Sequence, residues 1–534
     1  MKLHYTILFL LISTVMFSQE DAWVYFNAKP NAQTYLDSPA LILSQRALDR
    51  RSNQNIALNF TDAPVETTYI TQIKASAGIT VLAKSKWLNA LHIKGNQANI
   101  LALKSISFVD KVVFANKTLN TTSKKVRENQ TSKTNDKLET AIDYAYGSSA
   151  NQIQMLNGHV LHQQNYTGTG KIIAVMDAGF PGVNIAQPFQ RLRDNNLILG
   201  GYDYVSRNTN FYTGGNHGTL VLSTMGGYKD NALVGTAPDA SYYLFRTEID
   251  AMEEPLEESL WVEAAEKADS LGVDIITTSL GYFAERDNPN YNYTYSDMNG
   301  ITTFVSRGAE IAFSKGIIVV ASAGNEGTKT EKHIGGPADA VSVIAVGAVM
   351  ADKSRSSFSS IGPSYDGRIK PDVMAKGTAA VVSDVSGNIG TANGTSFSCP
   401  IMAGMIACLW QAFPTKTNQE IRDIVIQSAD KYLTPDNNYG YGIPNFGATL
   451  AIDTFANKDF VVYPNPATTT IAFSFPDGIN NASVVIYSVL GQKVIDKNIT
   501  GQNQSLSVES LNSGLYFYTF DADGLHKTGK IIKQ

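Results

Sequence analysis

Three residues of the sequence could together carry out acyl transfer by a serine. Asp177 closes the apolar run 172–176, His217 lies in a Gly-rich segment, and Ser396 lies where a Gly turn leads into an apolar stretch. This chemistry needs a hydroxyl nucleophile, a base that takes its proton and a carboxylate that holds the base. Read singly, the three are a buried acid, a surface histidine and a helix-capping serine. Together they predict a catalytic triad, because three independent coincidences are a poor alternative.

The secondary structure expected around these residues would bring them to one place. From about residue 144 to 455, short β-branched runs alternate with amphipathic stretches. Continuous apolar strands separated by helices are typical of an α/β fold, a parallel sheet with helices on both faces, whose chemistry lies at the carboxyl ends of the strands. The predicted strands are 171–176, 273–278, 317–321 and 341–346, and the predicted helices include 260–271 and 304–315.

The sequence around the three residues resembles the subtilisin-like serine protease family (subtilases, peptidase S8). The family's signatures are similar to Val-Met-Asp-Ala-Gly at 175–179, His-Gly-Thr at 217–219 and Gly-Thr-Ser-Phe-Ser-x-Pro at 394–400, and they occur in the family's order. The resemblance covers about residues 144–455. It implies a subtilisin-like fold and a serine endopeptidase that acts on protein or peptide substrates, with no cofactor required for the chemistry.

The same resemblance implies an oxyanion donor and a substrate cleft. Asn325, just after the strand predicted at 317–321, is expected to complete the oxyanion hole with its side-chain amide. Ser279, Leu280 and Gly281 resemble the strand that binds the substrate backbone as an added strand. The pocket for the residue before the scissile bond would be formed by small, uncharged residues: Ser322, Ala323, Gly324 and, at its floor, Gly335. Such a pocket favours large apolar or aromatic side chains.

Some features depart from the family's pattern. The residue after Asp177 is Ala178, where Ser or Thr is common, so one possible hydrogen bond is lost. The loop 228–231 is shorter than the loop with which many relatives bind calcium, which leaves a structural calcium ion open. The acidic stretch 253–258 is interpreted as a solvated helix start, with substrate selection as the alternative.

The residues before this block differ from it in composition. Residues 1–18, with a basic start and an apolar run, are a predicted signal peptide, and 119–143, rich in Asn, Thr, Lys and Ser, are a predicted linker. Between them, residues 19–118 mix strand-like and helical patterns, as in a small α+β module. This module resembles the inhibitory propeptides of such proteases. The chain is therefore expected to be a zymogen that its own propeptide inhibits.

The tail, residues 459–534, alternates short strands with Gly-containing turns, which predicts a small all-β sandwich. Its segments Val-Tyr-Pro-Asn-Pro at 462–466, Leu-Asn-Ser-Gly-Leu-Tyr at 511–516 and Lys-Ile-Ile-Lys at 530–533 resemble the type A sorting domains of type IX secretion in Bacteroidetes proteins. The resemblance implies the secretion machinery as a partner. It also implies a secreted or cell-surface protein that passes the periplasm and the outer membrane.

Charge and cysteine content narrow the expectations further. The net charge is +6 for residues 1–143 and −11 for 144–534, which suggests two parts that attract one another; two separately solvated surfaces are the alternative. A monomer is expected, and nucleic acid is not an expected partner. Cys399 and Cys408 lie on nearly opposite faces of one predicted helix, 396–413, so they are predicted to be buried free thiols and not a disulfide.

Other interpretations of single features remain. His159 and His162 could share a metal ion, although a solvated helix face is the simpler interpretation, and the sequence has no His-Glu-x-x-His motif of a zinc protease. A catalytically inactive subtilisin-fold protein that binds at the cell surface is a rival function. A polysaccharide-binding protein is another, because the alternating residues Tyr291, Tyr293 and Tyr295 permit an aromatic cluster; an insertion beside the substrate cleft explains them equally well.

Overall fold

The structure is a computed structural model of the chain. It describes residues 19–120, 144–250, 252–284, 286–455, 461–463, 465–474, 481–489, 491–500, 505–522 and 525–534. The expected signal peptide and residues 121–143 of the expected linker lie outside the described residues. The chain forms two compact units, Met1–Gly447 and Ala448–Gln534, which are described separately.

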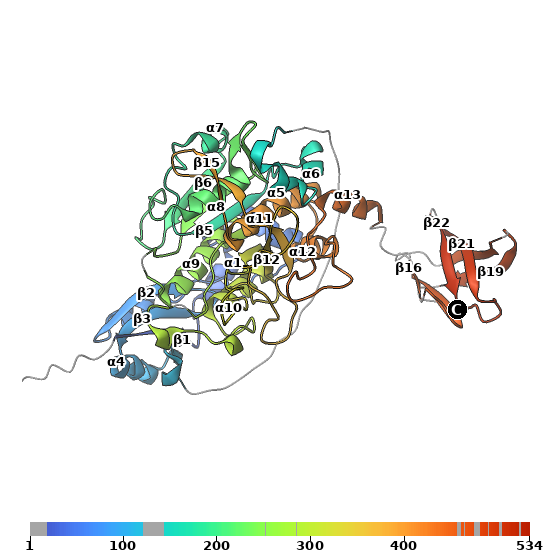
Figure 1. Ribbon diagram of the computed structural model, residues 1–534. Coiled ribbons are helices and arrows are strands. Elements are labelled where there is room, and N and C mark those ends of the chain that lie inside the picture. Colours follow the sequence, from blue (N-terminus) through green and yellow to red (C-terminus); the bar gives the residue numbers. More distant parts are fainter. Residues whose placement is uncertain are drawn as a thin grey trace, which may run out of the picture. The chain divides into compact units, whose positions relative to one another are not determined.

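A seven-stranded sheet lies at the centre of the first unit (Figure 1). Its strand order is β13-β12-β11-β10-β5-β9-β6, and every neighbouring pair is parallel. The predicted α/β sheet is therefore confirmed, and its central strands read as apolar runs because helices cover both faces. The strands are β5 (Ile172–Asp177), β6 (Ile198–Asp203), β9 (Ser241–Arg246), β10 (Ile275–Thr278), β11 (Ile318–Ser322), β12 (Ile344–Val349) and β13 (Val373–Lys376).

Two pairs of long helices cover this sheet. The helices α9 (Leu256–Leu271) and α10 (Phe304–Ser314) pack together on one face, and α8 (His217–Gly226) and α11 (Thr395–Ala412) pack together on the other. Both cysteines lie in α11, buried and free, as predicted. The shorter elements of the central domain are α5 (Ala150–Gln154), α6 (His159–Gln163), α7 (Gln190–Asp194), α12 (Asn418–Gln427), β7 (Tyr228–Lys229), β8 (Leu233–Val234), β14 (Ala380–Ser383) and β15 (Ile389–Ala392). The helix α13 (Phe446–Phe455) contains the boundary between the two units.

The N-terminal module, residues 19–120, is the expected α+β module. Its antiparallel sheet has the order β2-β3-β1-β4, and one face of the sheet packs on α3 and α4. Trp23 on the other face, and Trp87 in the turn between β2 and β3, join the hydrophobic core that includes residues of α9 and α10. The elements are β1 (Gln19–Phe26), α1 (Ala32–Asp37), α2 (Gln45–Asn53), α3 (Thr67–Lys74), β2 (Ile79–Ser85), β3 (Ala90–Asn96), α4 (Gln97–Ala102) and β4 (Val109–Phe114).

The C-terminal unit is rich in strands. Two antiparallel sheets share one apolar core that includes Phe473, Ile486 and Phe520, which confirms the predicted all-β sandwich. One sheet contains β16 (Val461–Tyr463), β17 (Thr470–Ser474) and β20 (Ser505–Ser507). The other contains β18 (Asn481–Ser488), β19 (Lys493–Thr500), β21 (Gly514–Ala522) and β22 (Leu525–Lys533).

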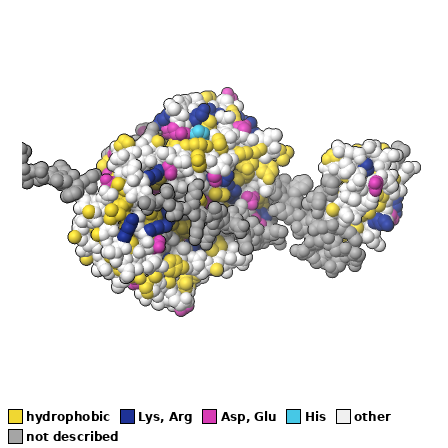
Figure 2. Space-filling model, turned by 90° about the horizontal axis from the view of Figure 1, so that it is seen from below, with side chains coloured by type: hydrophobic (Ala, Val, Ile, Leu, Met, Phe, Trp, Pro, Cys, Tyr) yellow, Lys and Arg dark blue, Asp and Glu magenta, His cyan; other side chains and the backbone are white. Residues whose placement is uncertain are grey.

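Charged and apolar side chains are mixed on the visible surface (Figure 2). On the face shown in Figure 2, basic and acidic side chains are interspersed with hydrophobic ones and form no continuous basic stripe. Among the described residues, no helix is long and apolar enough to cross a membrane.

Candidate active site

Asp177 and His217 meet at the carboxyl edge of the sheet. Asp177 is the last residue of β5 and is fully buried, and His217 is the first residue of α8. The Nδ1 atom of His217 lies 2.8 Å from Oδ1 of Asp177, and the backbone N–H of Ala178 donates to the same oxygen at 2.8 Å. The carboxylate therefore orients the imidazole by its Nδ1 side and leaves Nε2 for another partner.

Ala178, where Ser or Thr is common in the family, leaves one oxygen of Asp177 without a hydrogen bond in the part of the chain that the structure describes. The second carboxylate oxygen of Asp177, Oδ2, is buried and has no hydrogen-bond partner among the described residues. Ala178 has no hydroxyl to supply that hydrogen bond, as the sequence predicts. An unpartnered buried oxygen costs free energy. The carboxylate is held through its other oxygen, by the ion pair with His217 and the backbone N–H of Ala178.

The ionisation of His217 follows from this contact. The negative charge of Asp177 raises the pKa of His217, while burial lowers it; the hydrogen bond that His217 donates to Asp177 and the charge of Asp250 raise it further. His217 keeps 34% of its side chain exposed, so substrate can reach it. Asp250 lies close to the same segment, because a Cβ at Gly215 would stand 1.9 Å from its Oδ1 atom.

Ser396 lies beside this pair, in the first turn of α11. The ring of its neighbour Phe397 is 6.1 Å from the ring of His217, so the starts of α8 and α11 adjoin. The hydroxyl of Ser396 donates to the carbonyl of Ser279 at 3.3 Å, and Ser279 Oγ donates to the carbonyl of Ser396 at 2.8 Å. This reciprocal pair fixes the end of β10 against the start of α11. In this arrangement the Ser396 hydroxyl is paired with a backbone carbonyl, and among the described residues no hydrogen bond joins it to His217.

Asn325 lies on the other side of the α11 start. Its side-chain oxygen accepts hydrogen bonds from the backbone N–H of Thr395 at 2.9 Å and from Thr395 Oγ1 at 3.1 Å. The Thr395 hydroxyl also accepts from the backbone N–H of Gly324 at 3.2 Å. Because these bonds hold the amide by its oxygen, the amide nitrogen remains available to donate at the amino end of α11, where the helix dipole favours negative charge.

A cavity of about 330 Å³ adjoins these residues. Its lining includes five of the seven residues predicted to bind substrate: Gly281, Ser322, Ala323, Gly324 and Gly335. Ser279 and Leu280 are not among the lining residues. They lie between the end of β10 and Gly281 in the chain. Beyond Gly281 and Gly335, the backbones of Tyr282 and Gly336 pair at 2.8 and 3.2 Å and close the two walls together.

The cavity also contains residues that the sequence did not point to. The expectation of an uncharged pocket holds for the four small residues, but charged side chains lie around the rest of the wall. Glu326 and Lys329 form an ion pair at 2.7 Å, and Glu331 keeps 40% of its side chain exposed. Glu326 could have been found, because it directly follows Asn325. The additional lining residues are Phe283, Ala284, Glu326, Lys329, Thr330 and Glu331.

Two other interpretations of single residues are wrong. His162 does not lie on a solvated helix face; it is fully buried, with Nδ1 bonded to Tyr146 Oη at 2.8 Å and Nε2 to the Thr236 carbonyl at 3.0 Å. Among the described residues, no group of three or more His, Cys, Asp or Glu side chains is placed to hold a metal ion. Nor is the acidic stretch fully solvated, because Glu257 and Glu258 are buried.

Two of the three tyrosines that suggested an aromatic binding surface are buried. Tyr291 and Tyr293 expose 7% and 9% of their surface. Tyr293 donates a hydrogen bond to Glu258 at 2.8 Å, and its backbone N–H donates to the Phe283 carbonyl at 2.8 Å. Tyr291 and Tyr293 therefore form part of the structure beside the cavity, in agreement with the insertion, and offer no platform for a sugar ring. Tyr295 is partly exposed and stacks on His333.

Three family models match separate parts of the chain. The model of the subtilase family matches residues 158–442, the Bacteroidota peptidase S8 propeptide domain matches 21–134, and a secretion system C-terminal sorting domain matches 461–534. The N-terminal module is therefore a propeptide domain. The sorting domain indicates export to the cell surface or beyond it.

Several curated proteins are similar to the central domain. Subtilisin NAT of Bacillus subtilis subsp. natto is 33% identical over 299 residues, which cover 55% of this chain and 70% of that protein. Subtilisin of Bacillus pumilus is 33% identical over 299 residues, 55% of this chain and 96% of the relative. Serine protease AprX of Bacillus subtilis is 28% identical over 341 residues, 58% and 72% of the two chains. The parallel sheet, the motifs and the family match agree: this chain belongs to the subtilase family of serine proteases and is built for secretion.

Proposed function

We propose that this secreted subtilase is an endopeptidase, made as a zymogen, that hydrolyses peptide bonds with Asp177, His217 and Ser396. One observation carries the proposal. The Nδ1 atom of His217 is 2.8 Å from the buried Asp177 carboxylate, at the start of a helix that adjoins the helix start bearing Ser396. An inactive surface-binding subtilisin fold has no need of a buried carboxylate that orients a half-exposed histidine.

The mechanism assigns a role to each residue. Ser396 Oγ attacks the carbonyl carbon of the peptide while its proton passes to His217 Nε2, and Asp177 stabilises the imidazolium that forms. The tetrahedral intermediate collapses when His217 gives this proton to the leaving amine, which leaves an acyl group on Ser396. A water molecule, deprotonated by the same histidine, then hydrolyses the ester and restores the Ser396 hydroxyl.

The developing oxyanion would be bound at the amino end of α11. The backbone N–H of Ser396 and the side-chain amide of Asn325 are its proposed donors. The two hydrogen bonds from Thr395 to the Asn325 oxygen support this role, because they fix the amide before substrate arrives. Donors held in place in this way stabilise charge without reorganising during the reaction.

The 330 Å³ cavity is the proposed pocket for the side chain before the scissile bond. Its inner wall consists of Ser322, Ala323 and Gly324, and Phe283 adds an apolar surface, whereas the charged side chains are partly exposed. We expect kcat/KM to be higher for peptides with Phe, Tyr or Leu before the cut than for otherwise identical peptides with Arg or Lys. A series of chromogenic peptides measures this preference. Faster cleavage after Arg or Lys would mean that Glu326 and Glu331, and not the apolar wall, select the substrate.

The propeptide domain ends close to this pocket, which supports its role as an inhibitor. Lys117 pairs with Asp297 at 2.5 Å and lies 4.3 Å above the ring of Tyr293. Tyr293 in turn bonds through its backbone to Phe283, which lines the cavity. The chain that continues from Lys117 therefore starts beside the substrate cleft, where an inhibitory segment has to lie.

The proposed function is tested on the exported protein. We expect its mature form to begin within the predicted linker, 119–143, and to digest casein. Sequencing of the amino terminus and a casein assay on the same sample provide the two measurements. Secreted protein with such an amino terminus but no turnover of casein would favour the inactive surface-binding alternative.

The pH dependence of the mature enzyme depends on His217, because only the neutral imidazole can accept a proton. Since Asp177 raises the pKa of His217, we expect the acid limb of the kcat/KM profile to lie above pH 6.5, the ordinary histidine value. Activity is then lost as the pH falls through this raised pKa. Asp250→Asn removes a charge that raises the pKa, so the acid limb should move to lower pH.

The shift should be larger at low ionic strength, because the carboxylate of Asp250 is 44% exposed and salt screens it. Asp352→Asn, which removes an exposed carboxylate in a turn, is the matched control and should leave the profile unchanged. An acid limb that stays in place in Asp250→Asn at low salt contradicts this account.

A tightly bound calcium ion is not part of the proposal. The loop after α8 is the short hairpin of β7 and β8, which offers the carboxylate of Asp230 alone. One carboxylate is a weak ligand set for calcium, which takes six to eight oxygen ligands. The chemistry proposed above uses protein side chains and water.

A further inference from the structure

Besides the contact of Lys117 with Asp297 near the cleft, the propeptide domain contacts the catalytic domain in two other places. One is its sheet, which lies on α9 and α10: Glu266 accepts hydrogen bonds from Ser85 Oγ and from the backbone N–H groups of Lys86 and Trp87 at 2.7 to 3.0 Å. The other is an arm, residues 27–66, inserted between β1 and α3. The helix α2 of this arm reaches the segments that connect α9 to β10 and α10 to β11.

These connecting segments lie at the edge of the sheet opposite the proposed active site. Val273 lies two residues before β10 and Lys315 three residues before β11, whereas Asp177, Ser279 and Ser322 lie at the other ends of their strands. In a parallel sheet the two ends of the strands form opposite edges. A substrate in the cleft therefore competes for no contact of the arm.

The arm satisfies backbone groups at two helix ends. Arg50 donates to the carbonyls of Val273 at 2.5 Å and Lys315 at 3.2 Å, and Gln54 donates to the carbonyl of Gly316 at 2.9 Å. Carbonyls at the carboxyl end of a helix lack partners within the helix, and the helix dipole there favours cations. The contact is close, because a Cβ at Gly272 would lie 2.8 Å from the backbone N of Ala47.

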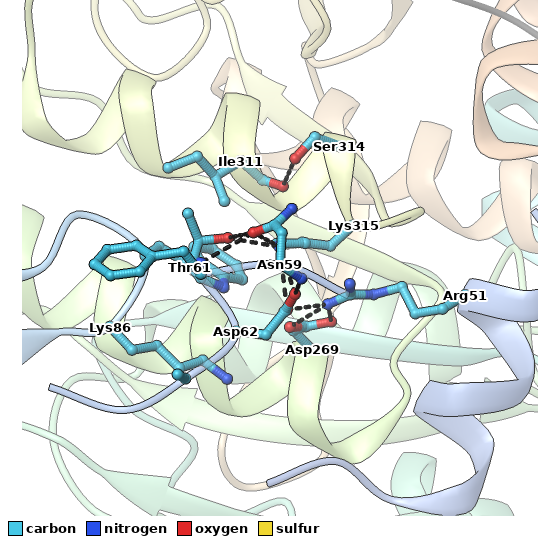
Figure 3. Close-up of polar contacts among 12 residues, drawn as sticks. Arg51, Asn59, Thr61, Asp62, Lys86, Asp269, Ile311, Ser314 and Lys315 are labelled. Carbon is cyan, nitrogen blue, oxygen red and sulfur yellow. Dashed lines mark hydrogen bonds and ion pairs between the residues drawn. The ribbon is translucent and has the colours of Figure 1, made fainter. Parts of the chain in front are cut away.

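A buried ion network joins the same surfaces (Figure 3). Asp269 at the end of α9 accepts from Arg50 at 2.5 Å and, through both oxygens, from Arg51 at 2.8 and 2.9 Å. In the opposite direction, Lys315 of the catalytic domain donates to Asp62 of the arm at 3.1 Å, and Arg51 pairs with Asp62 at 2.9 Å. The four charged side chains Arg50, Arg51, Asp62 and Asp269 are at most 4% exposed.

This pattern is reciprocal, because each partner supplies both a cation and an anion. Asp269 finds its cationic partners, Arg50 and Arg51, on the arm, and Arg46 at the rim adds an ion pair with Asp274. A charge buried in this way is costly if its partner is removed while the surfaces stay in contact. Separation of the two surfaces would instead expose all of these groups to water.

We propose that the α9 and α10 ends form a second binding site for the propeptide domain, the basal anchor site, whose ligand is the arginine-bearing helix α2. The proposal rests on the zymogen function above and extends it. Because the basal anchor site does not overlap the substrate cleft, it holds the propeptide domain in place after the linker is cut. The inhibitory end then stays at high effective concentration near the cleft, and cutting alone does not release activity.

The test uses the full chain with Ser396→Ala, so that no self-digestion occurs, and with the recognition sequence of a site-specific protease inserted between residues 120 and 144. After cleavage at that sequence and dilution, native mass spectrometry follows the fraction of catalytic domain that retains the propeptide domain. We expect Asp269→Asn to accelerate dissociation at least about thirtyfold, since removing one partner of a buried charge pair costs about 2 kcal/mol or more and 1.4 kcal/mol is tenfold.

Asp194→Asn, which removes an exposed carboxylate of α7, is the matched control and should dissociate like the reference chain. If Asp269→Asn dissociates within about twofold of the reference, the proposal is overturned. Arg46→Met, on the rim and 40% exposed, is a second variant that leaves the buried network intact and should accelerate dissociation by a smaller factor, at least about threefold. An unchanged rate in Arg46→Met counts against the rim contact and against the proposal.

A last experiment distinguishes binding at the basal anchor site from binding in the cleft. A peptide substrate at saturating concentration, which occupies the cleft of the inactive chain, should leave the propeptide domain bound to the reference. Release by this peptide alone would overturn the proposal. None of these readouts uses catalysis, so failure of the proposed protease function in the casein assay and failure of the anchor are distinguishable.

Discussion

Ser396→Ala is expected to lower kcat for peptide hydrolysis on the order of 10⁶-fold, the loss known for removal of a triad serine. The hydroxyl is the nucleophile, and no other group can replace it in forming the acyl intermediate. In the structure this hydroxyl makes one hydrogen bond, to the Ser279 carbonyl at 3.3 Å, so little stability depends on it. The variant should therefore keep its circular dichroism spectrum and its thermal midpoint, and it should retain the uncut propeptide if maturation is autocatalytic.

Ser398→Ala provides the matched control. It removes another hydroxyl from the same turn of α11, one that donates to the Thr395 carbonyl at 3.0 Å. This variant should stay within about tenfold of wild type, because its hydroxyl is buried inside the helix and faces no substrate. Normal casein digestion by Ser396→Ala, after exclusion of contaminating proteases, would end the serine-protease mechanism for this site.

The second large effect is expected for Asn325→Leu, which removes the proposed oxyanion donor at similar volume. The amide would bind an oxygen that carries charge only in the transition state, so kcat should fall by about 10² to 10³ while KM stays nearly unchanged. Steady-state kinetics with a chromogenic peptide separates the two parameters. A loss in kcat below about threefold, or about 0.7 kcal/mol, would remove Asn325 from this role. A change confined to KM would make it a ground-state contact.

Thr395→Val tests whether the position of the Asn325 amide affects kcat. Its hydroxyl donates to the Asn325 oxygen and accepts from Gly324, but its backbone N–H also holds that oxygen. Loss of the hydroxyl should therefore loosen the amide without removing it, and kcat should lie between wild type and Asn325→Leu. A larger loss than in Asn325→Leu would show that Thr395 acts in another way.

The positions of Asp177, His217 and Ser396 could be predicted because each is fixed by local sequence. An apolar run ends at Asp177, and Gly-containing turns precede both helix starts, so strand ends and helix starts were visible without knowledge of distant contacts. In a parallel sheet these ends fall on one edge. Fold class and site could therefore be read from the motifs together.

The burial of charged residues could not be predicted, because it depends on partners far away in the sequence. Glu258 is buried since Arg286 and Tyr293, 28 and 35 residues further on, bond to it. His162 is buried against Tyr146 and Thr236 for the same reason. An acidic run or a pair of histidines looks solvated until such partners are known.

The contacts of the arm could not be predicted either, because their partners lie even further away in the sequence. The pairing of Arg51 with Asp269 spans 218 residues and two domains. In sequence, the positive charge of residues 1–143 and the negative charge of the remainder left two interpretations open, attraction between the two parts or two separately solvated surfaces. Which side chains carry that attraction, and that they lie away from the cleft, only the folded chain shows.

The two buried thiols of α11 offer a direct way to time the opening of this protein. Burial raises the pKa of the Cys399 thiol to about 12 and that of Cys408 well above the ordinary value, so neither forms a thiolate near neutral pH while the helix is packed. Thiol reagents attack the thiolate, so modification in excess reagent has to wait for a local or global unfolding event. Cys399 lies three residues from Ser396 and Cys408 twelve, and peptide fragmentation in tandem mass spectrometry distinguishes the two labelled positions. Their relative labelling rates would therefore report whether the end of α11 that carries the nucleophile opens on its own or only when the whole helix unfolds.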